Sequence, residues 1–211
     1  MKHFIAAALL TVCIHFAQAQ GQALTLAQVK TNMENSPNPP GYVKDVLKKR
    51  YKLDTVIITN TTRFTGIADS IAYYGKLKKV YGPIQKKYLV QVLAKLPNTF
   101  NRISQIFIDT TIFTRRIADS LANSIITRVN TGAASFADMA MAYSMGGEGA
   151  TKGDLGWIAR GAMLPDIEKE IERHKTGEIF KIWSNNGMHI IKKTAEPKQD
   201  IGFVLMLRVW W

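Results

Sequence analysis

The fold of this chain is decided by one run, TKGDLGWIARGAM, which extends from Thr151 to Met163. Its three glycines can take positive φ and allow close approach of neighbouring backbone. The Gly-Asp pair near its start predicts a tight turn into a short strand, with Leu155 and Trp157 on one face of that strand. Pro165 stands where a helix would begin. The run therefore predicts a short strand followed by a helix, a connection found in many α/β folds.

The segments on either side of this run supply the rest of a small α+β unit. Upstream, residues 103–108 predict a buried strand, and residues 115–129 predict a helix with apolar residues at every fourth position. Ser135 is followed three residues later by an aspartate and predicts the start of another helix. Downstream, residues 165–175 predict a helix, and residues 179–192 predict a hairpin around an Asn-Asn-Gly turn.

Four short sequences keep a fixed order across residues 100–195, and together they resemble the parvulin family of peptidyl-prolyl cis/trans isomerases. They are SFADMA with a following YS pair, the GDLGW run, TGEIF and GMHII. The resemblance implies the α+β class, with a small antiparallel or mixed sheet surrounded by helices. It also implies an enzyme that rotates the peptide bond before proline, needs no cofactor and binds proline-containing polypeptide clients.

The resemblance implies two groups of site residues. The first group would hold the reacting amide and is expected to be catalytic: His189, Gln105 and Ser184. The second group would bind the substrate, with an apolar slot for the proline ring: Leu155, Met163, Ile167, Gly146 and Asn186.

Three of these positions depart from the family pattern. Gln105, Gly146 and Ile167 stand where family members usually carry histidine, cysteine or aspartate, and phenylalanine. A glutamine still donates and accepts hydrogen bonds, so losing one good polar contact would cost about 1–3 kcal/mol and leave residual catalysis. Glu148, two residues after Gly146, is a partial replacement for the missing group. His189 also has a plain alternative as a core histidine, because two isoleucines follow it.

The composition limits the classes of partner. Apolar residues make up 46% of the chain, which is ordinary for a globular protein. The formal net charge of +12 favours acidic partners. The basic residues are mostly scattered, however, apart from residues 48–50 and a group at 76–79. A solvated basic face is the simpler interpretation, and we expect no nucleic-acid partner.

Residues 1–19 predict a signal peptide. Lys2 is the charged start, residues 4–16 are apolar, and an Ala-Gln-Ala sequence predicts cleavage after Ala19. No later stretch predicts a membrane span, so we expect a periplasmic or secreted protein. The single cysteine, Cys13, lies in this leader. The mature chain would then have no thiol and no cysteine-based metal site, and we expect no metal.

Residues 20–99 predict a smaller α/β segment that precedes the isomerase domain. Residues 36–41 are rich in proline and predict a linker or turn. A helix is expected over residues 42–50, and a β-branched run predicts a strand over residues 55–59. The Pro97-Asn98 pair is expected to separate this region from the isomerase domain at 100–195.

Part of the N-terminal region resembles a later part of the chain. Residues 75–92 predict the same order of elements, turn, strand, loop and strand, as residues 177–192. Two interpretations stay open: a shortened, degenerate parvulin-like half, or a chance similarity of two helix–hairpin units. In this first copy, Leu89 or Val90 would stand in the place of His189.

Beyond the isomerase domain, residues 196–211 predict one more strand, expected to pair with the N-terminal region. The whole pattern predicts an exported peptidyl-prolyl isomerase that assists the folding of other exported proteins. Two alternatives stay open. One is a non-catalytic holdase that kept the cleft, and the other is a basic envelope-binding protein that uses its N-terminal region.

Overall fold

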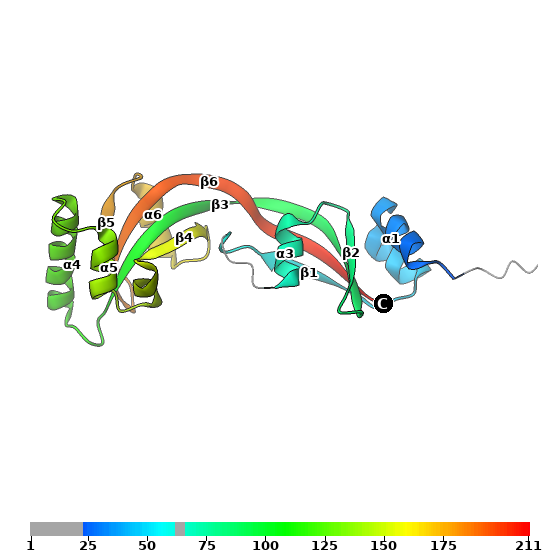
Figure 1. The fold of residues 1–211 in the computed structure, drawn as a ribbon, viewed down its shortest axis with the longest axis horizontal. Coiled ribbons are helices and arrows are strands. Elements are labelled where there is room, and N and C mark those ends of the chain that lie inside the picture. Colours follow the sequence, from blue (N-terminus) through cyan, green and yellow to red (C-terminus); the bar gives the residue numbers. More distant parts are fainter. Residues whose placement is uncertain (1–22, 62–65) are drawn as a thin grey trace, which may run out of the picture.

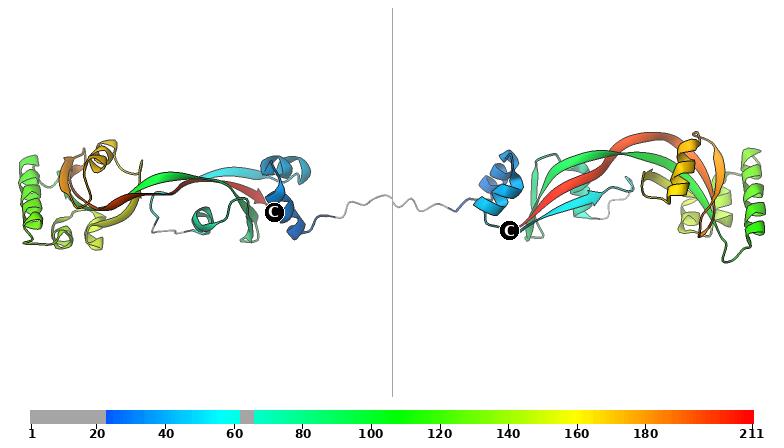
Figure 2. Two further views of the ribbon diagram at one scale, coloured as in Figure 1. Left: turned by 90° about the horizontal axis from the view of Figure 1, so that it is seen from above. Right: turned by 180° about the vertical axis from the view of Figure 1, so that it is seen from behind.

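The computed structural model describes residues 23–61 and 66–211, so the leader expected over residues 1–19 and its cleavage site lie outside the described part. The molecule is an elongated arch with a lobe at each end (Figure 1). Two long strands, β3 (Tyr88–Asp109) and β6 (Gly187–Trp210), run antiparallel from one lobe to the other. Both views in Figure 2 show these two strands side by side along the arch.

One lobe, here called the C-lobe, contains the second half of β3, the first half of β6 and the elements between them. These elements are α4 (Arg115–Asn130), α5 (Phe136–Tyr143), the 3₁₀ helix η2 (Gly147–Thr151), β4 (Asp154–Ala159), α6 (Pro165–Arg173) and β5 (Ile179–Trp183).

The other lobe, here called the N-lobe, contains the first half of β3, the last half of β6 and the elements that precede β3. These elements are α1 (Leu26–Asn35), α2 (Pro39–Gly41), the π-helical turn η1 (Tyr42–Val46), β1 (Tyr51–Ile57), α3 (Ile67–Tyr74) and β2 (Val80–Ile84).

The strands of the described residues form one sheet, with the order β1-β6-β3-β2. In the C-lobe, β4 pairs with β3 and β5 pairs with β6. In the N-lobe, β1 pairs with β6 and β2 pairs with β3. All of these pairs are antiparallel, so the same two strands form the centre of both lobes.

The C-lobe sheet has an apolar cluster on each face, because successive side chains of a strand point to opposite faces. Helices α4 and α5 pack on one face against Ile106, Ile108 and Ile190. Helix α6 packs on the other face, and we call this second group the α6 cluster. Its buried members are Ile103, Ile167, Ile171, Phe180 and Ile191.

The α+β class expected from the sequence is confirmed, and the C-lobe elements follow their predictions closely. Helix α4 begins at Arg115, and α5 begins directly after Ser135. The Ser135 hydroxyl accepts a hydrogen bond from the Asp138 N–H at 3.0 Å, as the capping pattern predicted. The expected hairpin is the pair β5–β6, which turns through residues 184–186.

The N-lobe corrects several predictions. The expected helix over residues 42–50 is only the short turn η1, and the expected strand over 55–59 is β1, which begins at Tyr51. Helix α1 was not predicted at all. Its signal was a capping box, in which Thr25 and Gln28 satisfy each other's backbone N–H groups. The proline-rich stretch that follows forms a helical turn, since proline is tolerated at a first helical position.

The expected break at Pro97-Asn98 is wrong, because β3 continues through it. The pairing register of β3 with β6 shifts between Leu96 and Pro97, and a proline is tolerated at such an irregularity. The other expected boundary, between residues 195 and 196, lies inside β6. Residues 203–209 of β6 pair with β1, so the end of the chain belongs to the N-lobe sheet.

Strand β4 corrects one further prediction. Leu155 packs against the α6 cluster, whereas Trp157 packs against a different cluster beneath α3. The reason is a register shift at Gly156, which has φ +71. Gly156 lies opposite Ile103, whereas the next β3 residue, Ser104, lies opposite Asp154. This bulge inserts one residue into β4, so the simple alternation of faces fails there.

Candidate functional site

The centre of the candidate site is a contact between the two long strands. Gln105 on β3 lies opposite Ile191, and His189 on β6 lies opposite Phe107. This register places both polar side chains on the α6 side of the sheet. The His189 Nδ1 atom and the Gln105 Oε1 atom are 3.2 Å apart. Both side chains are buried, with 8% of each residue exposed.

The β5–β6 turn holds the other side of His189. The Ser184 Oγ atom lies 2.8 Å from the His189 Nε2 atom. The same oxygen accepts a hydrogen bond from the backbone N–H of Asn186 at 3.1 Å. Asn186 therefore supports Ser184 through its backbone. The structure brings together the three residues of the expected catalytic group, His189, Gln105 and Ser184.

A fourth polar residue, Glu148, joins this group from η2. Its Oε1 atom accepts a hydrogen bond from the Ser144 hydroxyl at 2.8 Å and lies 3.5 Å from the Gln105 Nε2 atom. Ser144 is fixed in turn, because its hydroxyl oxygen accepts the Phe107 N–H at 2.9 Å. The sequence offered Glu148 only as a partial replacement for a missing group, and its contact with Gln105 depends on tertiary packing.

Gly146 contributes to the site by lacking a side chain. Its backbone has φ −94 and ψ 172, which any residue adopts, so conformation does not require glycine there. A Cβ atom built on Gly146 would lie 2.6 Å from the Cδ atom of Glu148 and would overlap its carboxylate. The space beside Gly146 is thus filled by the Glu148 carboxylate.

The expected apolar slot is only partly assembled. Leu155, Met163 and Ile167 all belong to or pack against the α6 cluster. They line three different hollows, however, rather than one. Ile167 is almost fully buried, with 2% exposed, because it forms the inner stripe of α6 together with Ile171.

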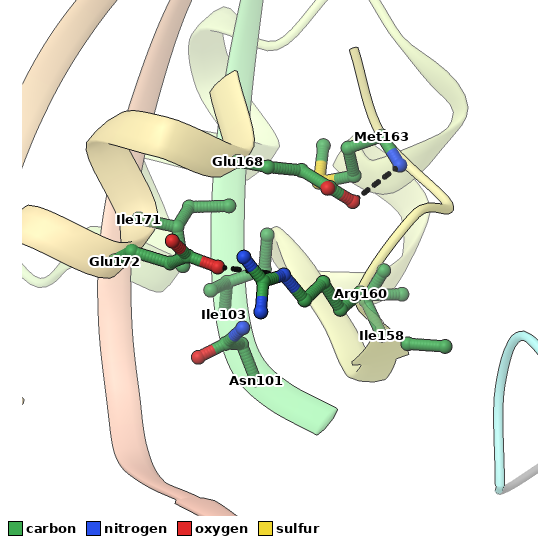
Figure 3. Close-up of a pocket in the computed structure, with 9 residues that line it drawn as sticks. Asn101, Ile103, Ile158, Arg160, Met163, Glu168, Ile171 and Glu172 are labelled. Atoms are coloured by element: carbon green, nitrogen blue, oxygen red, sulfur yellow. Dashed lines mark hydrogen bonds and ion pairs between the residues drawn. The ribbon is translucent and has the colours of Figure 1, made fainter. Parts of the chain in front are cut away.

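The hollow beside Met163 lies between α6, the middle of β3 and the end of β4 (Figure 3). The Glu168 carboxylate accepts the Met163 N–H at 3.1 Å and so fixes the loop that carries this side chain. An ion pair between Arg160 and Glu172, with an N–O distance of 3.0 Å, spans the same hollow. Met163 is therefore held on a constrained loop above an apolar floor.

The hollow beside Ile167 borders the polar group. Its lining includes Ser184, Pro165, Trp183 and Arg115. The Arg115 guanidinium lies over the Trp183 ring, 5.1 Å from its centroid, and such a cation–π contact holds both side chains in place. Ser184 thus connects this hollow with the row of hydrogen bonds through His189.

Burial decides the charge of His189. Removal from water lowers the pKa of the imidazole below its ordinary value of 6.5, because burial disfavours the charged form. The negative charge of Glu148 opposes this shift but does not reverse it. The site at neutral pH is therefore a neutral imidazole inside a hydrogen-bonded row.

The fold and the site together define a class of protein. A small α+β unit holds a buried row of hydrogen-bonding side chains beside an apolar cluster, a combination typical of binding sites. Residues 88–197 match the family described as PPIC-type PPIASE domain. This match covers just over half of the chain, and the chain belongs to that family.

Individual relatives match shorter parts of the chain. The chaperone SurA of Aromatoleum aromaticum is 36% identical over 85 residues, which are 40% of this chain and 19% of that protein. The chaperone SurA of Chromobacterium violaceum is 33% identical over 85 residues, with a similar coverage of 40% and 20%. The chain thus spans about a fifth of the length of these curated relatives.

A solved structure shows a similar partial match. The peptidylprolyl isomerase PrsA from Bacillus anthracis shares 31% identity, with a TM-score of 0.41 over 46% of this chain and 42% of that chain.

Proposed function

We propose that this chain is a peptidyl-prolyl cis/trans isomerase that binds Xaa-Pro segments of polypeptide clients. The observation that carries the proposal is the buried row of Gln105, His189 and Ser184 beside the α6 cluster. Family membership supports the same activity. Within residues 23–61 and 66–211, every helix is too short or too polar to cross a membrane.

To catalyse this reaction, the site must bind the twisted amide more tightly than the planar amide. The peptide bond before proline resists rotation with a barrier of about 18–20 kcal/mol, because its C–N bond has partial double-bond character. An acceleration of about 10⁴–10⁵ requires roughly 5.5–7 kcal/mol of binding that favours the twisted amide. Hydrogen-bonding groups that are fixed before the substrate arrives supply such binding without reorganising during the reaction.

We propose that Leu155, Met163 and Ile167 bind the proline side of the segment. The support is their common place at the α6 cluster, next to the polar row. Because they line separate hollows, a proline ring would have to settle between Met163 and the buried edge of Ile167. In this proposal Gly146 leaves room for the Glu148 carboxylate. Asn186 supports Ser184 by donating a hydrogen bond from its backbone N–H.

We also propose that the clients are exported proteins whose folding the isomerase assists. Two observations support this role: the signal-peptide pattern of residues 1–19, and matching relatives that are named chaperones. In this proposal the mature protein works in the periplasm or outside the cell.

A proline-coupled peptide assay tests the activity. His189→Ala and Met163→Ala should each lower kcat/KM by about 5- to 150-fold, the range expected for one lost contact of 1–3 kcal/mol. The matched control is Met141→Ala, which truncates an exposed methionine on α5. This control should keep near wild-type turnover.

The same assay separates the holdase alternative, which the departures at Gln105, Gly146 and Ile167 favour. A wild-type protein that binds a proline peptide but does not accelerate its isomerisation would contradict the enzyme and support the holdase.

A further inference from the structure

The polar row of the site consists of Glu148, Gln105, His189 and Ser184, and the hydrogen bonds along it have a donor-to-acceptor direction. The Gln105 amide lies between Glu148 and His189, and the His189 imidazole lies between Gln105 and Ser184. An amide, a neutral imidazole and a hydroxyl can each donate and accept, so these three groups alone allow two opposite directions. An ionised carboxylate can only accept. At the other end of the row, the Ser184 Oγ atom also lies 3.4 Å from the Gly187 carbonyl oxygen, a longer contact than its 2.8 Å contact with His189. Glu148 is the acceptor that carries a charge, and it is therefore the group that can choose between the two directions.

The Glu148 carboxylate determines which atom donates and which accepts in each group of the row. Gln105 must turn its NH₂ group toward the Glu148 oxygen, since its own carbonyl oxygen would be repelled there. The Gln105 Oε1 atom then faces the His189 Nδ1 atom, which must carry the proton in order to donate. The His189 Nε2 atom is left as an acceptor, and the Ser184 hydroxyl donates to it at 2.8 Å.

Ser144 confirms the polarity at the carboxylate end. Its hydroxyl oxygen already accepts the Phe107 N–H, so its own hydrogen is free for Glu148. The carboxylate also has a defined place, because the missing side chain of Gly146 leaves room for it. Gly146 has an ordinary backbone conformation, so this room is the reason that the structure gives for a glycine there.

We propose that Glu148 is a positioning residue which, acting through Gln105, fixes His189 in the tautomer protonated at Nδ1. The catalytic meaning of that tautomer rests on the proposed isomerase function, whereas the tautomer itself does not. In the twisted amide, only donors and acceptors that already point the right way lower the barrier. If the hydrogen bonds of the row could reverse their direction, a fraction of the molecules would present a donor to the substrate where an acceptor is needed, or the reverse.

The test reads the tautomer directly by ¹⁵N NMR of the His189 ring in the full mature chain at pH 7.5. The wild type should show a protonated Nδ1 and an unprotonated Nε2. Glu148→Gln keeps the shape of the side chain but can also donate, so the ring should shift toward a mixture of tautomers. The control Glu172→Gln, at the ion pair with Arg160, should leave the ring unchanged.

A second variant moves the carboxylate back instead of removing it. In Gly146→Asp combined with Glu148→Gly, the new carboxylate starts from the space that the Glu148 carboxylate now fills. It should restore the Nδ1 tautomer that Glu148→Gly alone loses. Under the proposed function, kcat should fall by about 5- to 150-fold in Glu148→Gln with little change in KM, and recover in the relocated variant.

Two results would overturn the inference: a wild-type ring protonated at Nε2, or a ring that Glu148→Gln does not change. The tautomer could shift as expected in Glu148→Gln while the wild type shows no isomerase activity. That result would leave this inference standing and reject the proposed function.

Discussion

At the scale of single residues, His189 shows how burial and hydrogen bonding divide the control of one side chain. Burial lowers the pKa of its imidazole and keeps it neutral, while its neighbours Gln105 and Ser184 decide where the remaining proton sits. A histidine in a core could have the same low pKa without any polar partner. Under the proposed function, these two partners favour a site histidine over the core histidine that the sequence left open.

The low pKa of His189 predicts a dependence of stability on pH. Between the lowered folded value and the ordinary value of 6.5, the unfolded chain binds more protons than the folded chain. The contribution of His189 to the free energy of unfolding is therefore complete above 6.5 and is lost as pH falls through the folded value. Urea unfolding at pH 7.5, 6.5 and 5.5 should show a steeper loss for the wild type than for His189→Gln, which cannot titrate. Parallel losses in both proteins would contradict this prediction.

At the scale of elements, α6 links the fold to the site. Its buried stripe, Ile167 and Ile171, packs against both long strands, and its first turn positions the Met163 loop through Glu168. The helix period in the sequence predicted this stripe, because residues four apart share a face. The period could not predict which strand residues the stripe would meet.

Truncation inside this stripe should be costly. Ile171→Ala removes a side chain that is 3% exposed, and such a cavity destabilises by about 2–5 kcal/mol. The neighbouring Glu172→Ala breaks a half-exposed ion pair and should cost at most about 1 kcal/mol. Urea unfolding of both variants at pH 7.5 measures the difference. Equal midpoints would show that α6 does not carry the C-lobe core.

At the scale of the whole molecule, the two lobes repeat one arrangement. In each lobe a helix, α3 or α6, precedes a hairpin that ends in a long strand. The hydrogen bonds also correspond. The Lys78 N–H donates to the Val92 carbonyl and the Val92 N–H to the Lys79 carbonyl. In the C-lobe, Gly177, Lys193 and Glu178 make the same pair of bonds.

We propose on this basis that the N-lobe is a degenerate parvulin-like half. Its support is that β6 completes the N-lobe sheet in the way that β3 completes the C-lobe sheet. Counting back along β3 from Val92 places Tyr88 where His189 stands, so the expectation of Leu89 or Val90 is corrected by one or two residues. The Arg208 guanidinium lies over the Tyr88 ring at 5.3 Å, in the place of a glutamine–histidine pair.

The shared strands predict that the end of the chain stabilises its beginning. Leu207 is fully buried against Val29 and Met33 of α1. Leu207→Ala should cost about 2–5 kcal/mol and speed hydrogen exchange in α1 and β1. The control Phe203→Ala, at a side chain that is 37% exposed, should do much less. Unchanged exchange in α1 of the Leu207 variant would show that the N-lobe folds without β6.

The sequence by itself determined the family, the helices of the C-lobe, the β5–β6 hairpin and the polar residues at 105, 184 and 189. These features depend on local periodicity, turn chemistry and motif order, which a linear pattern records. Only the tertiary structure decided that β3 and β6 run unbroken through both lobes, that Gly156 puts a bulge into β4, and that Glu148 reaches Gln105. Each of these depends on strand register and on packing between residues far apart in the chain, and the energies that fix them belong to contacts rather than to any one segment.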